Sequence, residues 1–376
     1  MNIAYFSNQF SDATGHGLAR YSRELYSALR INGRDISVIP ISAWSSMSEF
    51  ELAQLEQETG LQILPLGRKL TSLCWTFLNT PPIERHINSE VDLVHAVSLG
   101  YPVATRKPLV VTVHDLGPLT HPEYFENTSP WIMKRSLSQA IKQAAQIICV
   151  SQSTADELLS VAGNQVQARI NVIHEGVSDA FFAPADPTSL AGLTLPPDGI
   201  PYILSTGKLS PRKNIHGLIR AMTSLADKIP HHLVLVGGDG WSVSEVYTLL
   251  EQSGMRDRVH LPGFVSDDQL RALYQRASVY VHPSYYEGFG LTLLEAMASG
   301  CPVVTSNVYS LPEVAGDAAL LVDPTSSDDI ASSIAAICTD DALASELRAK
   351  GKVRAESFKW SLCADRVADV YELAVG

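Results

Sequence analysis

The chain alternates between short apolar runs and longer stretches in which apolar residues recur at helical spacing. The runs LVVTVH, HLVLVGG and SVYVHP are apolar at consecutive positions, as expected for strands of a parallel sheet that helices cover on both faces. Alternation of strands and helices is typical of the doubly wound α/β class. We predict strands at 2–6, 36–40, 93–96, 109–114, 147–151, 170–174, 202–206, 232–236, 259–261, 278–282, 303–305 and 320–323.

A segment without periodicity divides the chain nearly in half. Residues 181–201, FFAPADPTSLAGLTLPPDGIP, are rich in proline and small residues, which is typical of a linker. A length of 376 residues also exceeds that of one ordinary core. We therefore predict two Rossmann-like domains, 1–185 and 186–358, whose parallel sheets face a central cleft. Ligands of open α/β sheets bind at the carboxyl ends of the strands, so we expect both substrates there.

Composition narrows the class of protein. Hydrophobic residues make up 45% of the chain and charged residues 18%, as in an ordinary globular protein. The formal net charge of -12 argues against non-specific binding to nucleic acid or anionic lipid, since both require a positive field. The five cysteines include no Cys-x-x-Cys pair, so neither a disulfide framework nor a zinc site is indicated. No signal region and no apolar run of about 18 residues is present, so we expect a cytoplasmic protein.

Residues 285–300, YYEGFGLTLLEAMASG, join a predicted strand to a predicted helix through a Gly-x-Gly turn. The start of a helix attracts anions, and Gly288 and Gly290 let a phosphate approach the backbone closely. Glu287 precedes this helix and Glu295 lies about one turn inside it. Carboxylates do not help to bind phosphate, so we expect the two glutamates to bind hydroxyl groups on either side of it. A nucleotide-sugar has sugar hydroxyl groups on both sides of its phosphates and therefore fits this arrangement. The alternative interpretation is a pair of surface glutamates.

A second group of residues supplies positive charge in the same half. The stretch STGKLSPRKN places Gly207 after a predicted strand, followed by Lys208, Arg212 and Lys213 before the next helix. Cations at the end of a strand can neutralise a diphosphate, and arginine can donate two hydrogen bonds to its oxygens. We therefore predict that this half binds the phosphates of the ligand.

The first half carries a weaker glycine signal and one notable histidine. Gly15 and Gly17 follow the first predicted strand, but Arg20 stands where a dinucleotide-binding motif has its third glycine, which disfavours NAD. His114 is the last residue of the predicted strand 109–114. A histidine at this position can have a structural role or contact the substrate, and the sequence is compatible with both.

Several motifs of other enzyme classes are missing. The sequence contains no Asp-x-Asp, so no metal ion bridging a diphosphate is indicated. It contains neither the P-loop of NTPases nor the Gly-x-Ser-x-Gly elbow of serine hydrolases. We expect no cofactor and no metal requirement.

On these motifs the chain resembles the retaining glycosyltransferases of family 4, which have the GT-B fold of two Rossmann-like domains. The resemblance spans nearly the whole chain. The matching motifs are Glu287-Gly-Phe-Gly-Leu-Thr-Leu-Leu-Glu295, Ser205-Thr-Gly-Lys-Leu-Ser-Pro-Arg-Lys-Asn214, Val259-His-Leu-Pro-Gly-Phe-Val265, Gly15-His-Gly-Leu-Ala-Arg-Tyr21, Thr112-Val-His-Asp-Leu116 and Val150-Ser-Gln-Ser-Thr154.

The resemblance implies a role for each site residue. Arg212 and Lys213 would hold the donor diphosphate, Glu295 its ribose, and Glu287 the transferred sugar. His114 would face the sugar-phosphate from the first domain, and the segment 359–376 would cross back to that domain. The family commonly has arginine at the position of Lys208, and a lysine there lacks the paired donors of a bidentate phosphate contact. The remaining donor-binding residues would be Gly15, Gly17, Gly207, Lys208, Phe264, Val265, Gly288, Phe289, Gly290 and Leu291.

The resemblance further implies a retaining hexosyltransferase that acts on a nucleotide-sugar in polysaccharide biosynthesis. The Pro-Arg-Lys-Asn sequence is similar to that of bacterial mannosyltransferases, which favours GDP-mannose as the donor. The acceptor would be a glycan, a lipid-linked glycan or another hydroxyl compound. A nucleotide-sugar epimerase of the same architecture and a non-catalytic nucleotide-sugar binding protein are the alternatives.

The stretch 65–78, PLGRKLTSLCWTFL, mixes basic and apolar residues. Such a stretch can lie on a membrane surface and bring a lipid-linked acceptor within reach, which would place the protein at the inner face of the membrane. A plain buried helix accounts for the pattern equally well.

Overall fold

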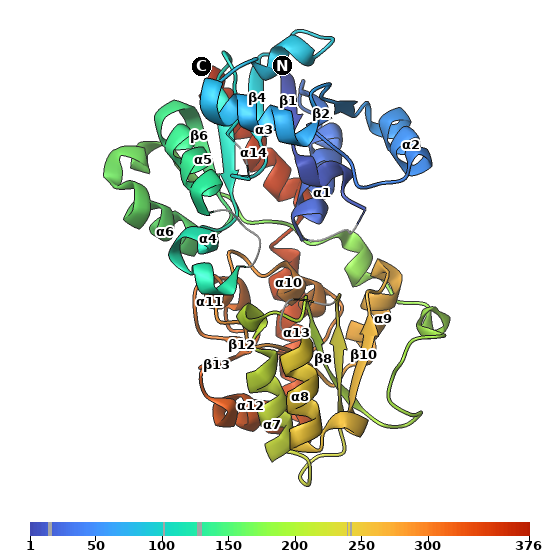
Figure 1. The fold of residues 1–376 in the computed structure, drawn as a ribbon. Helices are drawn as coiled ribbons and strands as arrows, with labels where there is room; N and C mark the ends of the chain where they lie inside the picture. The colour runs from blue at the N-terminus through green and yellow to red at the C-terminus, as the bar shows by residue number, and fades with distance from the viewer. Residues whose placement is uncertain (14–16, 101, 126–129, 239, 241–242) are drawn as a thin grey trace. The chain divides into compact units, whose positions relative to one another are not determined.

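The computed structural model describes residues 1–13, 17–100, 102–125, 130–238, 240 and 243–376. The chain forms two compact units (Figure 1). The first comprises the described residues within 1–123, 127–176 and 360–376, and the second those within 124–126 and 177–359. Among the helices of the described residues, none is long and apolar enough to cross a membrane.

The first unit is built on a seven-stranded parallel sheet of order β3-β2-β1-β4-β5-β6-β7. Buried aliphatic side chains of the strands form its core with the helices. The strands are β1 (Asn2–Phe6), β2 (Ser37–Ser42), β3 (Gln62–Ile63), β4 (Leu93–Ala96), β5 (Leu109–Val113), β6 (Ala144–Cys149) and β7 (Ile170–Val172). The helices are α1 (Gly17–Ile31), α2 (Glu49–Thr59), α3 (Gly67–Leu78), α4 (Gly117–Thr120), α5 (Pro130–Gln143), α6 (Gln152–Ala162) and α14 (Trp360–Val375).

The second unit repeats this architecture with a six-stranded parallel sheet of order β10-β9-β8-β11-β12-β13. Its strands are β8 (Tyr202–Thr206), β9 (His232–Val236), β10 (Val259–Gly263), β11 (Val279–His282), β12 (Val303–Ser306) and β13 (Leu320–Val322). Its helices are α7 (Ile215–Ser224), α8 (Val243–Ser253), α9 (Asp267–Arg276), α10 (Leu291–Ala298), α11 (Leu311–Ala315), α12 (Ser327–Thr339) and α13 (Asp341–Glu356). The predicted class, α/β with two parallel sheets, is confirmed.

A buried polar cluster joins the last helix, α14, to the sheet of the first unit. The helix packs against α1 and against β4, β5 and β6. His95 of β4 has Nδ1 at 2.7 Å from Tyr371 Oη of α14 and Nε2 at 2.8 Å from Thr112 Oγ1 of β5. Burial, with a smaller effect from His114, lowers the pKa of His95 to about 3. A neutral imidazole therefore lies between the helix and the sheet.

The boundary between the units differs from the predicted one at 185/186. It falls after Gly176, because the segment that follows packs on the second unit: Val177 N donates to Phe358 O at 2.8 Å, and Phe181 lies against Tyr274. Gly176 itself has little room, since a Cβ there would lie 2.4 Å from Trp360 N. The composition of 181–201 marks an irregular segment, but these contacts set the boundary ahead of it.

Candidate active site

The candidate site of the second unit lies where β8 and β11, neighbours in its sheet, end. After β8 the chain turns at Gly207, whose φ of +133° favours glycine, and reaches a 3₁₀ turn that carries Arg212 and Lys213. A Cβ at Gly207 would lie 2.8 Å from Lys213 Cε, so glycine also leaves room for the lysine side chain. Tyr285 N, after β11, donates to Arg212 O at 2.9 Å and joins the two loops.

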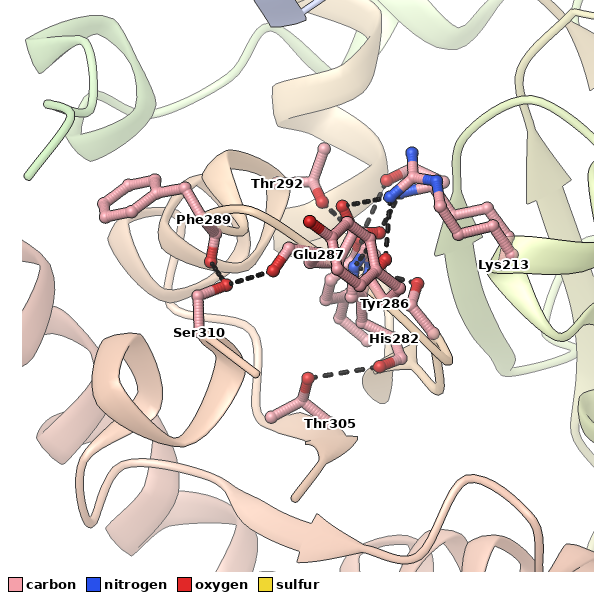
Figure 2. A network of polar contacts seen from close by, with 12 residues as sticks. Lys213, His282, Tyr286, Glu287, Phe289, Thr292, Thr305 and Ser310 are labelled. Carbon is pink, nitrogen blue, oxygen red and sulfur yellow. Dashed lines mark hydrogen bonds and ion pairs between the residues drawn. The ribbon is translucent and has the colours of Figure 1, made fainter. Parts of the chain in front are cut away.

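Glu287 forms ion pairs with both cations (Figure 2). Lys213 Nζ lies 2.7 Å from its Oε1, and Arg212 Nη1 contacts its Oε2. Arg212 Nη1 also donates to Tyr286 O at 2.9 Å. The side chains of Lys213 and Glu287 are only 12% and 11% exposed, so this pair is shielded from water.

The charges of this cluster follow from its burial and its partners. Burial favours the neutral form of Glu287, but Arg212, Lys213 and His282 together outweigh it and hold the pKa of Glu287 well below its usual 4.5. Burial lowers the pKa of Lys213, and Glu287 opposes that shift. Two cations facing one carboxylate leave a net positive charge, as a phosphate site requires.

A chain of hydrogen-bonded imidazole and hydroxyl groups begins at Glu287, with His282 and Thr292 labelled in Figure 2. His282 Nε2 lies 3.1 Å from Glu287 Oε1, and His282 Nδ1 lies 2.9 Å from Tyr280 Oη. Tyr280 Oη also contacts Thr206 Oγ1 of β8 at 2.8 Å and Thr292 Oγ1 of α10 at 2.9 Å. Burial, followed by Lys213, lowers the pKa of His282. The sequence motifs predict no role for His282, although its place at the end of the predicted strand 278–282 is a usable signal.

Ser310 contacts the backbone of the loop between Glu287 and α10 at two points. Ser310 Oγ lies 2.9 Å from Glu287 O and 2.8 Å from Phe289 O. Gly288 lies between these two residues, and Gly290, with φ of +114°, caps α10, which begins at Leu291. The glycine-containing turn ahead of a helix, expected from the sequence, is therefore present.

Glu295 lies inside α10 and is only 2% exposed. Tyr274 Oη, from α9, donates to its Oε2 at 3.4 Å. Because Glu287 and Glu295 are both largely buried, the alternative interpretation as two surface glutamates is wrong.

The other donor-binding candidates of the second unit lie at the same edge of the sheet. Lys208 follows β8 and is exposed. Phe264 and Val265 follow β10, which lies two strands from β8; Phe264 is 66% exposed and Val265 is buried. An exposed aromatic ring is suited to stacking on a flat ligand group.

The first unit holds His114 at the end of β5. Its Nδ1 lies 3.1 Å from Glu175 Oε1, its Nε2 lies 2.9 Å from Val97 O, and the ring packs edge-on against Tyr21 at 4.5 Å. Sequence reasoning missed Glu175, although it follows the predicted strand 170–174 at the edge where ligands bind. Gly17 opens α1 and is exposed, whereas Gly15 lies outside the described residues.

The described residues contain no group of three or more His, Cys, Asp or Glu side chains that could hold a metal ion. The largely buried charged groups at the ends of β8 and β11 are Arg212, Lys213 and Glu287. Their chemistry is that of an anion site beside buried carboxylates.

Two family models match the chain. Residues 194–354 match "Glycosyl transferases group 1", and residues 15–181 match "Glycosyltransferase Family 4". The two matches together span both halves of the chain.

Individual proteins are similar over nearly the full length. The chain is 30% identical over 371 residues to O-antigen chain mannosyltransferase B of Escherichia coli, covering 95% of this chain and 96% of that protein. Its structure is similar to that of sucrose-phosphate synthase from Thermosynechococcus elongatus, with a TM-score of 0.76, 23% identity and coverage of 99% and 98%. It is also similar to Anabaena HepE in complex with UDP and glucose, with a TM-score of 0.74, 18% identity and coverage of 99% of each chain. The two structures establish the likeness in fold.

Proposed function

The chain belongs to the glycosyltransferases of group 1 and family 4, and from this membership we propose that it transfers mannose from GDP-mannose, with retention of configuration, to a hydroxyl group of a glycan or lipid-linked glycan. The full-length relative named as a mannosyltransferase supports the sugar. An epimerase and a non-catalytic binding protein, the alternatives raised by the sequence, have no comparable support.

The observation that carries the proposal is the pairing of Arg212 and Lys213 with Glu287. When the bond between the sugar and the diphosphate breaks, negative charge grows on the leaving phosphate. Two cations held in advance stabilise that charge without rearranging, which is the largest single effect in many enzymes. In this proposal Glu287 holds both cations in position and accepts hydrogen bonds from hydroxyl groups of the transferred sugar.

The remaining residues take supporting roles in the proposal. Glu295, buried beside Tyr274, accepts hydrogen bonds from the ribose hydroxyls. Phe264 stacks on the base, and the amides from Phe289 to Leu291 bind the sugar-phosphate. We also propose that turnover needs no metal ion, because Arg212 and Lys213 supply the positive charge.

His114 has a positioning role in this proposal. Its Nε2 faces a carbonyl oxygen and its Nδ1 faces the Glu175 carboxylate, so both ring nitrogens are engaged. A histidine held in this way is poorly placed to accept a proton from the acceptor. It would instead present its ring to the donor sugar in a fixed orientation, which Glu175 maintains.

The test combines donor binding with turnover. GDP-mannose, UDP-glucose and ADP-glucose are compared for the rise in melting temperature that a bound ligand produces. GDP-mannose is expected to give the largest rise, and GDP release is expected to depend on an added mannan or lipid-linked glycan acceptor. A larger rise with a UDP- or ADP-sugar would overturn the proposed donor. Conversion of the donor in the absence of acceptor would indicate the epimerase instead.

A further inference from the structure

Helix α3 of the first unit presents a row of apolar side chains to solvent. The row follows helical spacing, and its members are between 37% and 61% exposed: Leu66, Leu70, Leu73 and Phe77. The opposite face buries Thr71, Trp75 and Thr76. A fully buried helix, one alternative from the sequence, is therefore wrong. Water contact with so many large apolar groups on one helix face is a signal of an interaction surface.

Helix α5 extends this surface. Trp131, in its first turn, is 53% exposed and lies beside Phe77 of α3, with ring centroids 5.6 Å apart. The two helices contact each other in the first unit. An exposed tryptophan at the edge of an apolar row is characteristic of surfaces that enter the boundary between water and lipid.

The charges on this surface are of one sign. The sequences of α3 and α5 contain no aspartate or glutamate, whereas the chain as a whole has a net charge of -12. Both helices carry exposed basic residues, namely Arg68, Lys69, Lys134, Arg135 and Lys142. Basic residues around an apolar row match an anionic bilayer, in which headgroups surround the acyl chains.

A cavity of about 180 Å³ lies beside the row, between α3 and α5. Its lining includes Thr76, Phe77, Arg135 and Lys142. Arg135 Nε donates to Thr76 O at 3.0 Å, and Thr76 Oγ1 is buried without a hydrogen-bond partner among the described residues. Arg135 and Lys142 are exposed cations at this cavity and are suitable donors for the phosphate of a lipid headgroup.

We propose that this α3–α5 surface docks on an anionic lipid bilayer, with the apolar row among the acyl chains and a lipid phosphate at the cavity. A second copy of the chain is a poorer occupant, because two such basic surfaces would repel each other. The proposal does not depend on the identity of the donor. It would hold the enzyme beside an acceptor that is itself anchored in lipid.

The test is flotation of the full chain with vesicles of phosphatidylcholine and with vesicles that also contain phosphatidylglycerol. We expect binding to the mixed vesicles that weakens as salt rises. The variant Leu73→Ser/Phe77→Ser should bind at least about tenfold more weakly. The variant Lys69→Ser/Lys134→Ser should lose on the order of tenfold by removing two charges.

Matched controls remove similar groups elsewhere. Phe50→Ser removes an exposed aromatic ring from α2, and Lys107→Ser/Lys228→Ser removes two exposed charges; both should float as the wild type does. The proposal is overturned if the wild type does not bind the mixed vesicles, or if its binding is independent of salt. Equal binding by surface variants and controls would overturn it too. So would a dimer in solution that only the surface variants disrupt.

Discussion

Lys213 Nζ lies 2.7 Å from Glu287 Oε1, in an ion pair that is shielded from water. The family resemblance assigns Lys213 to the donor diphosphate and Glu287 to the transferred sugar, so residues with different expected roles contact each other. Arg212 completes the cluster from the same 3₁₀ turn. Substituting any one of the three therefore changes the charge that acts on the other two. This coupling governs the predictions for the site.

Replacing Lys213 should damage catalysis more than stability. Lys213→Ala removes one of the two cations proposed to lie next to the leaving phosphate, and kcat/KM should fall by about 10²–10³-fold. Arg212 remains to pair with Glu287, so the free energy of unfolding should drop by only about 1–3 kcal/mol. Steady-state rates and urea unfolding measure the two effects. Lys228→Ala is the control, since Lys228 is exposed and lies between α7 and β9, outside the site; equal rate losses in both variants would contradict the assignment.

Glu175 should act through His114. Glu175→Ala frees the imidazole to turn and should lower kcat about tenfold or more. Glu175→Gln keeps an acceptor for Nδ1 and should lose less. Adding Glu175→Ala to His114→Ala should cost little more than His114→Ala alone, because residues that act as a unit are not additive. Independent, additive losses of kcat would show that Glu175 does not position His114.

Acid should destabilise the chain through His95. Its pKa in the folded protein is about 3, below the 6.5 of an unfolded chain, because burial disfavours the charged form. The neutral form that folding favours predominates above pH 6.5, so this contribution is complete there and is lost as the pH falls toward 3. At pH 5 the loss should be about 2 kcal/mol.

The measurement is urea unfolding of the wild type and of His95→Gln at pH 7 and pH 5. Glutamine cannot take up a proton, so the stability of the variant should fall by about 2 kcal/mol less over that interval. Other buried histidines contribute equally to both proteins and cancel in the comparison. An identical pH dependence would mean that His95 does not titrate as its burial predicts.

Chelation should leave turnover intact. Arg212 and Lys213 are proposed to provide the charge that a divalent ion supplies in other transferases, so rates in excess EDTA should equal those without it. A loss of activity that added Mg²⁺ or Mn²⁺ restores would show that a metal takes part.

The fold could be predicted from sequence to the level of its sheets. Apolar runs such as 109–114 and 232–236 predict strands covered on both faces, because they are too short for an ordinary helix and rich in valine. The edge strand Gln62–Ile63 was missed, since two residues form no pattern. The boundary between the units was misplaced because it depends on contacts such as Val177 with Phe358, which composition does not record.

The site was predictable as a set of residues and much less so as a set of contacts. Spacing placed Arg212 and Glu287 in one half of the chain, at ends of strands that proved to be neighbours. That Glu287 would be held by both cations depends on side-chain directions in two loops, which no local pattern specifies. The sequence around His282 and Glu175 does not specify whether each side chain faces the core or a ligand. Only the fold distinguishes these cases.

The central claim is that Arg212 and Lys213 bind the donor diphosphate while Glu287 binds its sugar and Glu295 its ribose. Calorimetric affinity for GDP, measured beside kcat for Glu287→Gln and Glu295→Gln, tests it most directly. Glu295→Gln should weaken GDP binding, because GDP carries the ribose. Glu287→Gln should leave GDP affinity unchanged or higher, since it removes a negative charge beside the phosphates, while kcat falls by roughly 10²-fold or more. Equal losses of GDP affinity in the two variants, with kcat unaltered at saturation, would contradict the account.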